Sequence, residues 1–368
     1  MEPDIQKPTA ILNPTIVKRN IARMAEKASR SGVRFRPHFK THQSAEVGEW
    51  FREAGVSAIT VSSVTMARYF ADHGWNDITI AFPVNWREID AMNDLASRID
   101  LHLLVESVET VDFLGENLTS SANLWIKTDT GYHRTGIEWH DSESQKSLVN
   151  AIAAHKNLNL CGLLTHSGHS YAARGQAAIQ AVYNETVECL NQARRQIQDF
   201  GIDSLEISIG DTPTCSAVDD LGAVDEIRPG CFVFYDLMQQ QIGACGLEDI
   251  AMAVACPVVA KHPARNRAVI YGGAIHFSKD SLLNADEQRF FGRVALPDSN
   301  GWFKATLPDC YIESLSQEHG IIVAPDEVMQ HLKIGDVVMV IPVHVCLTAN
   351  LLKSYVTVDG THIDMMGF

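Results

Sequence analysis

The chain has 368 residues, with 30 basic and 45 acidic side chains and a formal net charge of −15. Single hydrophobic cores stop growing at roughly 250–300 residues, so a chain of this length is expected to form two domains. Its negative charge repels nucleic-acid phosphates and anionic membrane surfaces alike. Neither a nucleic acid nor a membrane is therefore an expected partner.

Two further features of the sequence favour a cytoplasmic location. The longest nearly apolar run, residues 250–260, is far shorter than the roughly 20 residues of a membrane span, and no apolar signal core follows the N-terminus. The eight cysteines include no C-x-x-C pair and no tight framework of the kind found in small secreted domains. Reduced thiols in a cytosol are the simplest interpretation.

Between about residues 15 and 240, short β-branched apolar runs alternate with amphipathic stretches, which is the pattern of repeated strand–helix units. Eight strands are predicted, at 33–37, 58–62, 78–81, 101–105, 124–128, 161–166, 205–210 and 224–230. Helices are predicted between them, for example at 15–30, 43–54, 86–97, 142–154 and 177–200. Eight units favour a (β/α)8 TIM barrel over residues 13–240, and an open doubly wound sheet is the alternative that periodicity leaves open.

The sequence pattern changes after about residue 245. Strand-like segments such as 251–260 and 336–342 dominate, and Gly, Pro, Asn and Asp turns separate them. A C-terminal β-rich domain over residues 241–368 is therefore expected. Residues 1–12 precede the first barrel helix and are candidates for pairing with this domain.

Catalytic residues of such barrels follow the strands, so the segment after the first predicted strand is informative. RPHFKTH (36–42) contains Lys40 between His38 and His42. A neighbouring cation or an apolar wall would lower the pKa of this lysine from ~10.4 and leave the free amine that attacks an aldehyde. The same residues are also compatible with a lysine in an ordinary basic surface turn.

SIGDTPT (208–214) follows the seventh predicted strand and could bind a phosphate. Many barrels use backbone N–H groups such as those around Gly210, Asp211 and Thr212 for this purpose. The Asp211 carboxylate would repel a phosphate unless it turns outward or caps the following turn, and an ordinary Asp-Thr-Pro turn is the alternative. Tyr235, beyond the eighth strand, could add a phenolic hydrogen bond or be a core aromatic.

Two more strand ends carry polar side chains. In DTGYHRTG, Arg134 offers a rigid fork of donors for a phenolate or a carboxylate, unless Asp129 holds it in a structural ion pair. In HSGHSY, His166 and Tyr171 are suited to holding a planar ring or moving a proton, whereas His169 is expected to be a satisfied loop histidine.

Near the C-terminus, GDVVMVIPVHVCLT (335–348) is predicted to be an apolar strand ending in His344 and Cys346. Side chains two apart on a strand share a face, so an imidazole and a thiolate could both reach one ion, at ~2.0–2.1 and ~2.3 Å. Two donors are a weak signal, and the sequence does not locate a third ligand. An incomplete protein shell would leave positions for water and substrate, as a catalytic metal requires.

Taken together, these motifs resemble the D-threonine aldolase / D-serine dehydratase family, the metal-assisted relatives of alanine racemase with a pyridoxal-phosphate barrel and a β-domain. The resemblance spans nearly the whole chain and rests on RPHFKTH, DTGYHRTG, HSGHSY, SIGDTPT, RPGCFVFYD, the QEHG turn at 317–320 and PVHVCLT. It implies that Lys40 carries the cofactor as a Schiff base and acts as the base at Cα. It also implies a homodimer, in which the β-domain of one subunit closes the barrel mouth of the other.

The resemblance assigns the remaining site residues. The implied cofactor-binding residues are His38, Lys40, Arg134, His166, Tyr171, Gly210, Asp211, Thr212 and Tyr235, the metal ligands are His344 and Cys346, and the catalytic residues are Lys40 and His166. The His-x-Cys form resembles the zinc-dependent D-serine dehydratase branch, whereas aldolases of the family more often have His-x-Asp with manganese or magnesium. Three positions depart from the family pattern, namely Asp211 beside a phosphate, Gln43 after KTH, and Met66–Ala67 where an acidic residue is common.

The expected reaction is dehydration of a small D-3-hydroxy amino acid, such as D-serine, D-threonine or D-threo-3-hydroxyaspartate, to a 2-keto acid and ammonia. A divalent metal, with zinc preferred over manganese or magnesium, would stabilise the departing β-oxygen. The closest alternative is retro-aldol cleavage to glycine and an aldehyde, with His166 as the base for the β-hydroxyl. A racemase would need a second base opposite Lys40, and a non-catalytic cofactor carrier would have no use for the β-domain, so both are less favoured.

Overall fold

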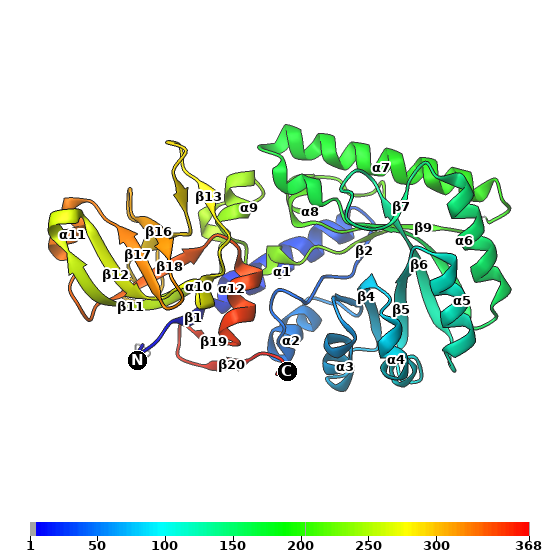
Figure 1. Ribbon diagram of the computed structural model, residues 1–368, viewed down its shortest axis with the longest axis horizontal. Helices are drawn as coiled ribbons and strands as arrows, with labels where there is room; N and C mark the ends of the chain where they lie inside the picture. The colour runs from blue at the N-terminus through cyan, green and yellow to red at the C-terminus, as the bar shows by residue number, and fades with distance from the viewer. Residues whose placement is uncertain (1–4, 203, 368) are drawn as a thin grey trace. The chain divides into compact units, whose positions relative to one another are not determined.

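The computed structural model describes residues 5–202 and 204–367, and the chain divides into two compact units (Figure 1). One unit comprises Ala22–Lys40 and Phe51–Gly230, and the remaining described residues form the other. Helices α1 (Pro14–Arg30) and α2 (Ala45–Glu53) each contribute residues to both units. Across the described ranges, no helix is both long enough and apolar enough to cross a membrane.

The first unit is built on a parallel sheet that contains all eight strands predicted from the sequence, in the order β2-β10-β9-β8-β6-β5-β4-β3. Their bounds are β2 (Arg34–Phe35), β3 (Ile59–Val61), β4 (Asp77–Pro83), β5 (Asp100–Val105), β6 (Ala122–Asp129), β8 (Leu158–Thr165), β9 (Glu206–Ile209) and β10 (Glu226–Ile227), and the short β7 (Ile137–Glu138) pairs with β6. The two end strands are joined just beyond β2, where the N–H of Phe39 donates to the oxygen of Thr60 (2.8 Å) and the N–H of Thr60 donates to the oxygen of Pro37 (2.9 Å). These bonds support the barrel and exclude the open doubly wound sheet.

Helices follow the strands and lie outside them, as Figure 1 shows. They are α3 (Val64–Asp72), η1 (Trp86–Glu88), α4 (Ile89–Ala96), α5 (Val108–Asn117), α6 (Ser142–Ala154), η2 (Gly168–Ala172), α7 (Gln176–Gln198) and α8 (Thr212–Ala217). Several begin at a polar N-cap, since Ser63, Ser107 and Asp141 each accept the N–H three residues further on. The strands between them are buried on both faces, which is why they read as continuous apolar runs.

The second unit is an antiparallel barrel. Its ring runs β12-β17-β16-β15-β18-β11 and closes because β11 also pairs with β12. The bounds are β11 (Met252–His262), β12 (Arg267–Tyr271), β15 (Gly292–Ala295), β16 (Tyr311–Leu315), β17 (His319–Val323) and β18 (Val337–Pro342), with a separate hairpin of β13 (Leu282–Leu283) and β14 (Arg289–Phe290). Its helices are η3 (Cys231–Val233), α9 (Leu237–Ile242), η4 (Leu247–Asp249), η5 (Pro263–Arg265), α10 (Ala274–Phe277), α11 (Asp326–His331) and α12 (Val345–Leu352).

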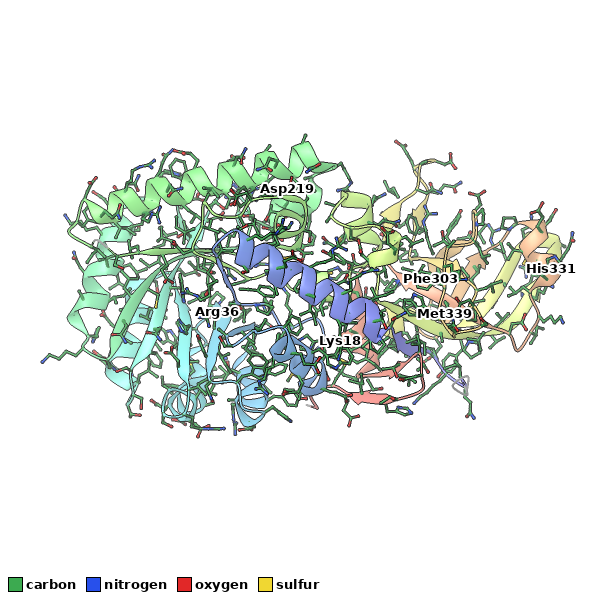
Figure 2. All side chains as sticks on the ribbon, turned by 180° about the vertical axis from the view of Figure 1, so that it is seen from behind. Lys18, Arg36, Asp219, Phe303, His331 and Met339 are labelled. Atoms are coloured by element: carbon green, nitrogen blue, oxygen red, sulfur yellow. The ribbon has the colours of Figure 1, made fainter. Side chains whose placement is uncertain are left out.

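The N-terminal segment belongs to this antiparallel sheet. Strand β1 (Thr9–Leu12) pairs antiparallel with β11 and parallel with β19 (Ser354–Thr357), which in turn pairs with β20 (His362–Asp364). The pairing expected of the N-terminal segment is thus present at Thr9–Leu12, while residues 1–4 of that segment lie outside the described residues. Each unit has its own buried interior, and Figure 2 labels Met339 on β18 and Arg36 in the parallel barrel, each 2% exposed.

Candidate functional site

Lys40 lies on the turn that follows the first strand of the parallel barrel, and its side chain is exposed. The N–H of His38 donates to the oxygen of Pro229 (2.9 Å), and the N–H of Lys40 donates to Nδ1 of His38 (3.3 Å). Between them, Phe39 is fully buried against Phe70, with the ring centroids 4.9 Å apart. His38 thus supports the turn that carries the lysine, and its contact with a cofactor stays a prediction.

His166 follows β8 and lies close enough to Lys40 for the two to interact electrostatically. Burial, reinforced by the positive charge of Lys40, lowers the pKa of His166 to about 3. Its Nδ1 is hydrogen-bonded to the carbonyl oxygen of Gly210. Because a carbonyl only accepts, Nδ1 carries the proton and Nε2 keeps its lone pair. His166 is therefore a neutral imidazole at physiological pH.

Arg134 is linked to His166 by the aromatic ring of Tyr132, a residue that was not identified from the sequence. Its guanidinium lies over the ring of Tyr132, 5.1 Å from the centroid, and that ring packs edge-on against His166 at 5.7 Å. The carboxylate of Asp129 does not hold Arg134 in the structural ion pair that the sequence left open. Asp129 instead accepts the N–H groups of Gly131 and Tyr132, both at 2.9 Å, and so shapes the turn.

The SIGDTPT segment turns from β9 into α8, and Asp211 is the N-cap of that helix. Its carboxylate accepts the N–H of Thr214 (2.8 Å), the hydroxyl of Thr214 (2.7 Å) and the hydroxyl of Ser170 (2.9 Å). Asp211 therefore takes the capping orientation that phosphate binding requires of it, and burial raises its pKa. The hydroxyl of Thr212 is buried and has no hydrogen-bond partner among the described residues. An anionic group fits at such an unpartnered donor, so this turn fits the cofactor phosphate.

For three further residues of the motifs, the structure says less about a role in the site. Tyr171, on η2, is half-buried, with its ring centroid 6.3 Å from that of His166. Nδ1 of His169 is buried without a hydrogen-bond partner among the described residues, so the expectation of a satisfied loop histidine is wrong for that atom. Tyr235 belongs to the other unit, is buried and has a φ of +49°. Its assignment to the phosphate stays a prediction.

Two buried cations in the barrel were not identified from the sequence. Arg228, at the end of β10, donates from Nε to the hydroxyl of Ser208 (2.7 Å), and burial lowers its pKa to about 10. Lys127, on β6, donates to the oxygen of Thr128 (2.8 Å), and burial lowers its pKa to about 8. Lys127 was overlooked because a single basic residue inside an apolar run carries no signal in the sequence, and Arg228 because its motif was assigned no role for that residue.

The metal donors predicted near the C-terminus lie in the antiparallel unit, and the strand expected there is wrong beyond Pro342. Strand β18 ends at that proline, His344 is the N-cap of α12, and Cys346 lies in the first turn of the helix. A proline followed by a helix cap ends the strand, so the shared face of a strand is not what relates the two donors. Their side chains nevertheless lie close enough to interact electrostatically.

This pair fits a divalent metal ion by the chemistry of its donors. Imidazole nitrogen and thiolate sulfur are the ligands that zinc prefers. The Cys346 sulfur also lies 3.3 Å from the hydroxyl oxygen of Thr41. Within the described part of the chain, no third His, Cys, Asp or Glu joins His344 and Cys346 in a group whose ligand atoms all lie within 4.8 Å of one another. An ion held by these two protein donors alone would keep positions for water or substrate, as a catalytic ion requires.

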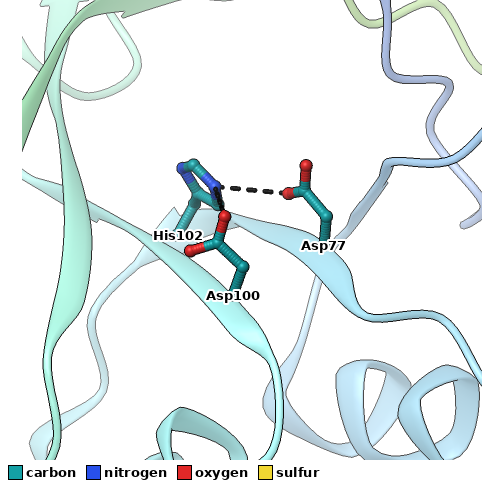
Figure 3. A group of neighbouring side chains, drawn as sticks. All are labelled: Asp77, Asp100 and His102. Atoms are coloured by element: carbon teal, nitrogen blue, oxygen red, sulfur yellow. Dashed lines mark ion pairs between the residues drawn. The ribbon is translucent and has the colours of Figure 1, made fainter.

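A group of metal-ligand type, Asp77, Asp100 and His102, lies at the N-terminal ends of β4 and β5, opposite the strand ends discussed above (Figure 3). Nε2 of His102 is 3.2 Å from Asp77 and 3.6 Å from Asp100, while Nδ1 accepts the indole N–H of Trp125 at 3.1 Å. The proton of the imidazole therefore faces the carboxylates, and Arg36 already pairs with Asp77. These interactions make the group a structural ion network.

Two family models match the chain, namely that of the alanine racemase N-terminal domain over residues 13–237 and that of a serine dehydratase domain over residues 251–358. The chain is 30% identical to the D-threo-3-hydroxyaspartate dehydratase of Delftia sp. (strain HT23), over 97% of this chain and 96% of that protein. It is 28% identical to the D-serine dehydratase of Dictyostelium discoideum, over 97% and 94% of the two chains.

Solved structures agree with these similarities. The Delftia enzyme superposes with a TM-score of 0.91 at 28% identity, covering 99% of each chain. A cysteine-to-alanine variant of a D-threo-3-hydroxyaspartate dehydratase, solved in the metal-free form, and a histidine-to-alanine variant are also similar, each with a TM-score of 0.89.

Proposed function

The chain belongs to the alanine racemase-like family of pyridoxal-phosphate lyases with a C-terminal serine dehydratase domain, and from this premise we propose that it dehydrates a D-3-hydroxy amino acid. The products are a 2-keto acid and ammonia, and D-serine, D-threonine and D-threo-3-hydroxyaspartate are the candidate substrates. The observation that carries the proposal is the similarity to two dehydratases over 97% of the chain.

The donor pair supports the dehydratase branch and a metal requirement. In the two variants of the related dehydratase, the substituted histidine precedes the substituted cysteine by two positions, and one of those variants is metal-free. His344 precedes Cys346 by the same spacing. We therefore assign His344 and Cys346 as ligands of a divalent ion, with zinc preferred because a thiolate is among the donors.

In the proposed site Lys40 would hold the cofactor, and its amine would remove the proton from Cα of the substrate. Bound pyridoxal phosphate supplies the electron sink that stabilises charge developing at Cα. The turn at Gly210, Asp211 and Thr212 binds the phosphate, with the unpartnered Thr212 hydroxyl as one donor. His166 adds a neutral ring beside Lys40 because its pKa is about 3, so it does not place a second positive charge next to the reacting amine.

A bound divalent ion supplies positive charge that stabilises a departing β-hydroxyl oxygen by several kcal/mol. His344 and Cys346 hold that ion, and the open positions described above admit water or substrate. The proposed cofactor site is completed by His38, Arg134, Tyr171 and Tyr235. We also propose that the barrel domain ends at residue 240 and that the β-domain begins at residue 241.

The identity of the product tests this function. The Zn²⁺-loaded protein is incubated with D-serine, D-threonine and D-threo-3-hydroxyaspartate, and a 2-keto acid with equimolar ammonia is expected from at least one of them. Formation of glycine and an aldehyde would show that the reaction is retro-aldol cleavage. Formation of the enantiomer of the substrate would show that it is racemisation. A protein that binds the cofactor and converts none of these compounds would be a carrier.

The cofactor lysine is tested separately by borohydride reduction followed by peptide mapping. A pyridoxyl adduct is expected at Lys40 and is expected to be absent from Lys40→Ala. The matched control is Lys156→Ala, which removes an exposed lysine elsewhere on the barrel and is expected to keep the adduct. An adduct at another lysine in the wild-type protein would contradict the assignment.

We also propose that the protein acts in the cytoplasm as a homodimer. Helices α10 and α12 of the antiparallel unit expose the apolar side chains of Ile275 (42%), Leu347 (45%) and Leu351 (40%). Neighbouring exposed apolar side chains commonly mark an interface. Sedimentation is expected to give a dimer that Leu347→Glu dissociates, whereas Ile334→Glu, at a residue 66% exposed on another segment, is expected to leave the dimer intact.

A further inference from the structure

A fully buried carboxylate lies beside the two metal-binding residues of the antiparallel unit. Asp236 is 0% exposed and is the N-cap of α9, where Oδ1 accepts the N–H of Gln239 at 2.8 Å. Capping alone uses only one of its two oxygens. A buried carboxylate is costly unless both oxygens are satisfied, so the partners of the second oxygen show what else this residue does.

The second oxygen, Oδ2, contacts the metal-ligand turn at the start of α12. The backbone N–H of Val345, which lies between the two ligands, donates to it at 3.0 Å. Nδ1 of His344 is 3.4 Å from the same oxygen. The thiol of Cys231 also donates to it, at 3.2 Å. One carboxylate oxygen therefore restrains the backbone and the imidazole of the turn.

These contacts distinguish the two nitrogens of the His344 ring. An ionised carboxylate only accepts hydrogen bonds, so the proton of the neutral imidazole belongs on Nδ1. Nδ1 is buried and makes no hydrogen bond of its own among the described residues, so Oδ2 of Asp236, 3.4 Å away, is the acceptor toward which its proton would be directed. Nε2 is left with its lone pair for an ion. In metal sites a carboxylate on the second ring nitrogen fixes the orientation of a histidine ligand and raises its basicity.

We propose that Asp236 is a positioning residue for the metal ion, which it serves by holding His344 in the Nδ1–H form so that Nε2 is the ligand atom. This inference rests on the proposed function, because it concerns the same two ligands. It goes further in assigning a role to a residue of RPGCFVFYD that does not itself bind the ion, and in naming the coordinating nitrogen.

The test compares Zn²⁺ dissociation constants, measured on chelator-stripped holoenzyme by competition with a chromophoric chelator. Asp236→Asn is expected to bind Zn²⁺ roughly 10- to 100-fold more weakly, the usual effect of losing such a partner. The matched control is Asp249→Asn, which removes a carboxylate of the same unit that is 5% exposed and pairs with Arg19 at 3.1 Å. That control is expected to keep the wild-type affinity.

A general loss of structure would also weaken binding, so the comparison is repeated in a His344→Ala background. There Asp236→Asn is expected to have almost no further effect, because the residue acts through the imidazole that has been removed. An equal loss in both backgrounds would show a merely structural role and would overturn the inference.

A measurement on the wild-type protein does not depend on the folding of any variant. With ¹⁵N-labelled histidine and bound Zn²⁺, the His344 signals, identified by their absence in His344→Ala, are expected to show a protonated Nδ1 and a metal-bound Nε2. Coordination through Nδ1 would overturn the inference. A wild-type protein that binds no Zn²⁺ overturns the metal part of the proposed function as well, whereas unchanged affinity in Asp236→Asn overturns this inference alone.

Discussion

The hydroxyl of Thr212 is a buried donor at the turn from β9 into α8 and has no partner in the described part of the protein. If it binds the cofactor phosphate, Thr212→Val removes one hydrogen bond to a charged group, a contribution of roughly 1.5–3 kcal/mol. The dissociation constant for pyridoxal phosphate should rise roughly 10- to 100-fold. Titration of the apoprotein, followed by absorbance, measures it.

The control for that variant is Thr79→Val. Thr79 also has a buried hydroxyl without a hydrogen-bond partner among the described residues, but it lies near the start of β4, in register with His102. The cofactor affinity of Thr79→Val should equal that of the wild type. If both variants bind the cofactor equally well, the phosphate lies elsewhere.

His42 gives the stability of the protein a definite pH dependence. Burial lowers its pKa from 6.5 to about 3, so in acid the unfolded chain takes up a proton that the folded chain refuses. The stabilisation is fully present above pH 6.5 and is lost as the pH falls toward 3. Between pH 7 and pH 5 this one group should reduce the free energy of unfolding by about 2 kcal/mol.

Urea unfolding at pH 7, 6 and 5 isolates this contribution. His42→Asn keeps an acceptor for the N–H of Ser44, which now donates to Nδ1 at 3.2 Å, and it removes the titrating group. Its stability should therefore fall less steeply with acid than that of the wild type. His140→Asn, at an exposed site, should keep the wild-type slope, and equal slopes in all three proteins would refute the assignment.

Among the elements, strands β8 and β9 leave no room for a side chain at Gly162. A Cβ atom at that position would lie 2.0 Å from the backbone oxygen of Glu206, its partner in the sheet register. Backbone in a closed barrel cannot move aside easily, so Gly162→Ala should reduce the free energy of unfolding by at least the ~1–3 kcal/mol typical of overpacking. Urea denaturation tests this, with Gly367→Ala as a control because no atom lies within 4 Å of its Cβ position.

The segment from β18 to α12 shows what periodicity can and cannot predict for an element. The apolar run up to Pro342 gives the strand correctly. The following His344 and Cys346 were assigned to the same strand, yet His344 caps a helix. Apolar residues continue through Val345 and Leu347, so the hydrophobic pattern alone does not mark the change from strand to helix. The two side chains lie close together at the start of a helix and not on one face of a strand, and their role as metal donors stays a prediction.

At the scale of the whole molecule, the proposed cofactor lysine and the proposed metal ligands belong to different units. Removal of the ion should therefore affect turnover without releasing the cofactor. Treatment with EDTA is expected to abolish keto-acid formation, to leave the absorbance of the cofactor bound at Lys40 and the circular dichroism unchanged, and to be reversed by Zn²⁺. Turnover that survives thorough chelation would remove the metal role assigned to His344 and Cys346.

The sequence by itself determined the order of elements and the chemistry of the strand ends. Alternating apolar periods are local, so the eight barrel strands and the motif containing Lys40 could be located without coordinates. The change to an antiparallel unit was equally visible, because its strands and turns follow one another along the chain.

The tertiary structure decided how side chains distant in sequence share their hydrogen bonds. Only the fold shows that Asp211 turns its carboxylate onto Thr214 and Ser170, that Arg228 is buried against Ser208, and that Asp236 contacts the turn of His344. A carboxylate or guanidinium is compatible with solvent, an ion pair or a cap as far as local sequence is concerned. Which of these three environments a charged side chain has depends on its desolvation and on the partners that the fold brings within about 3 Å. Neither can be read from the spacing of residues in the sequence.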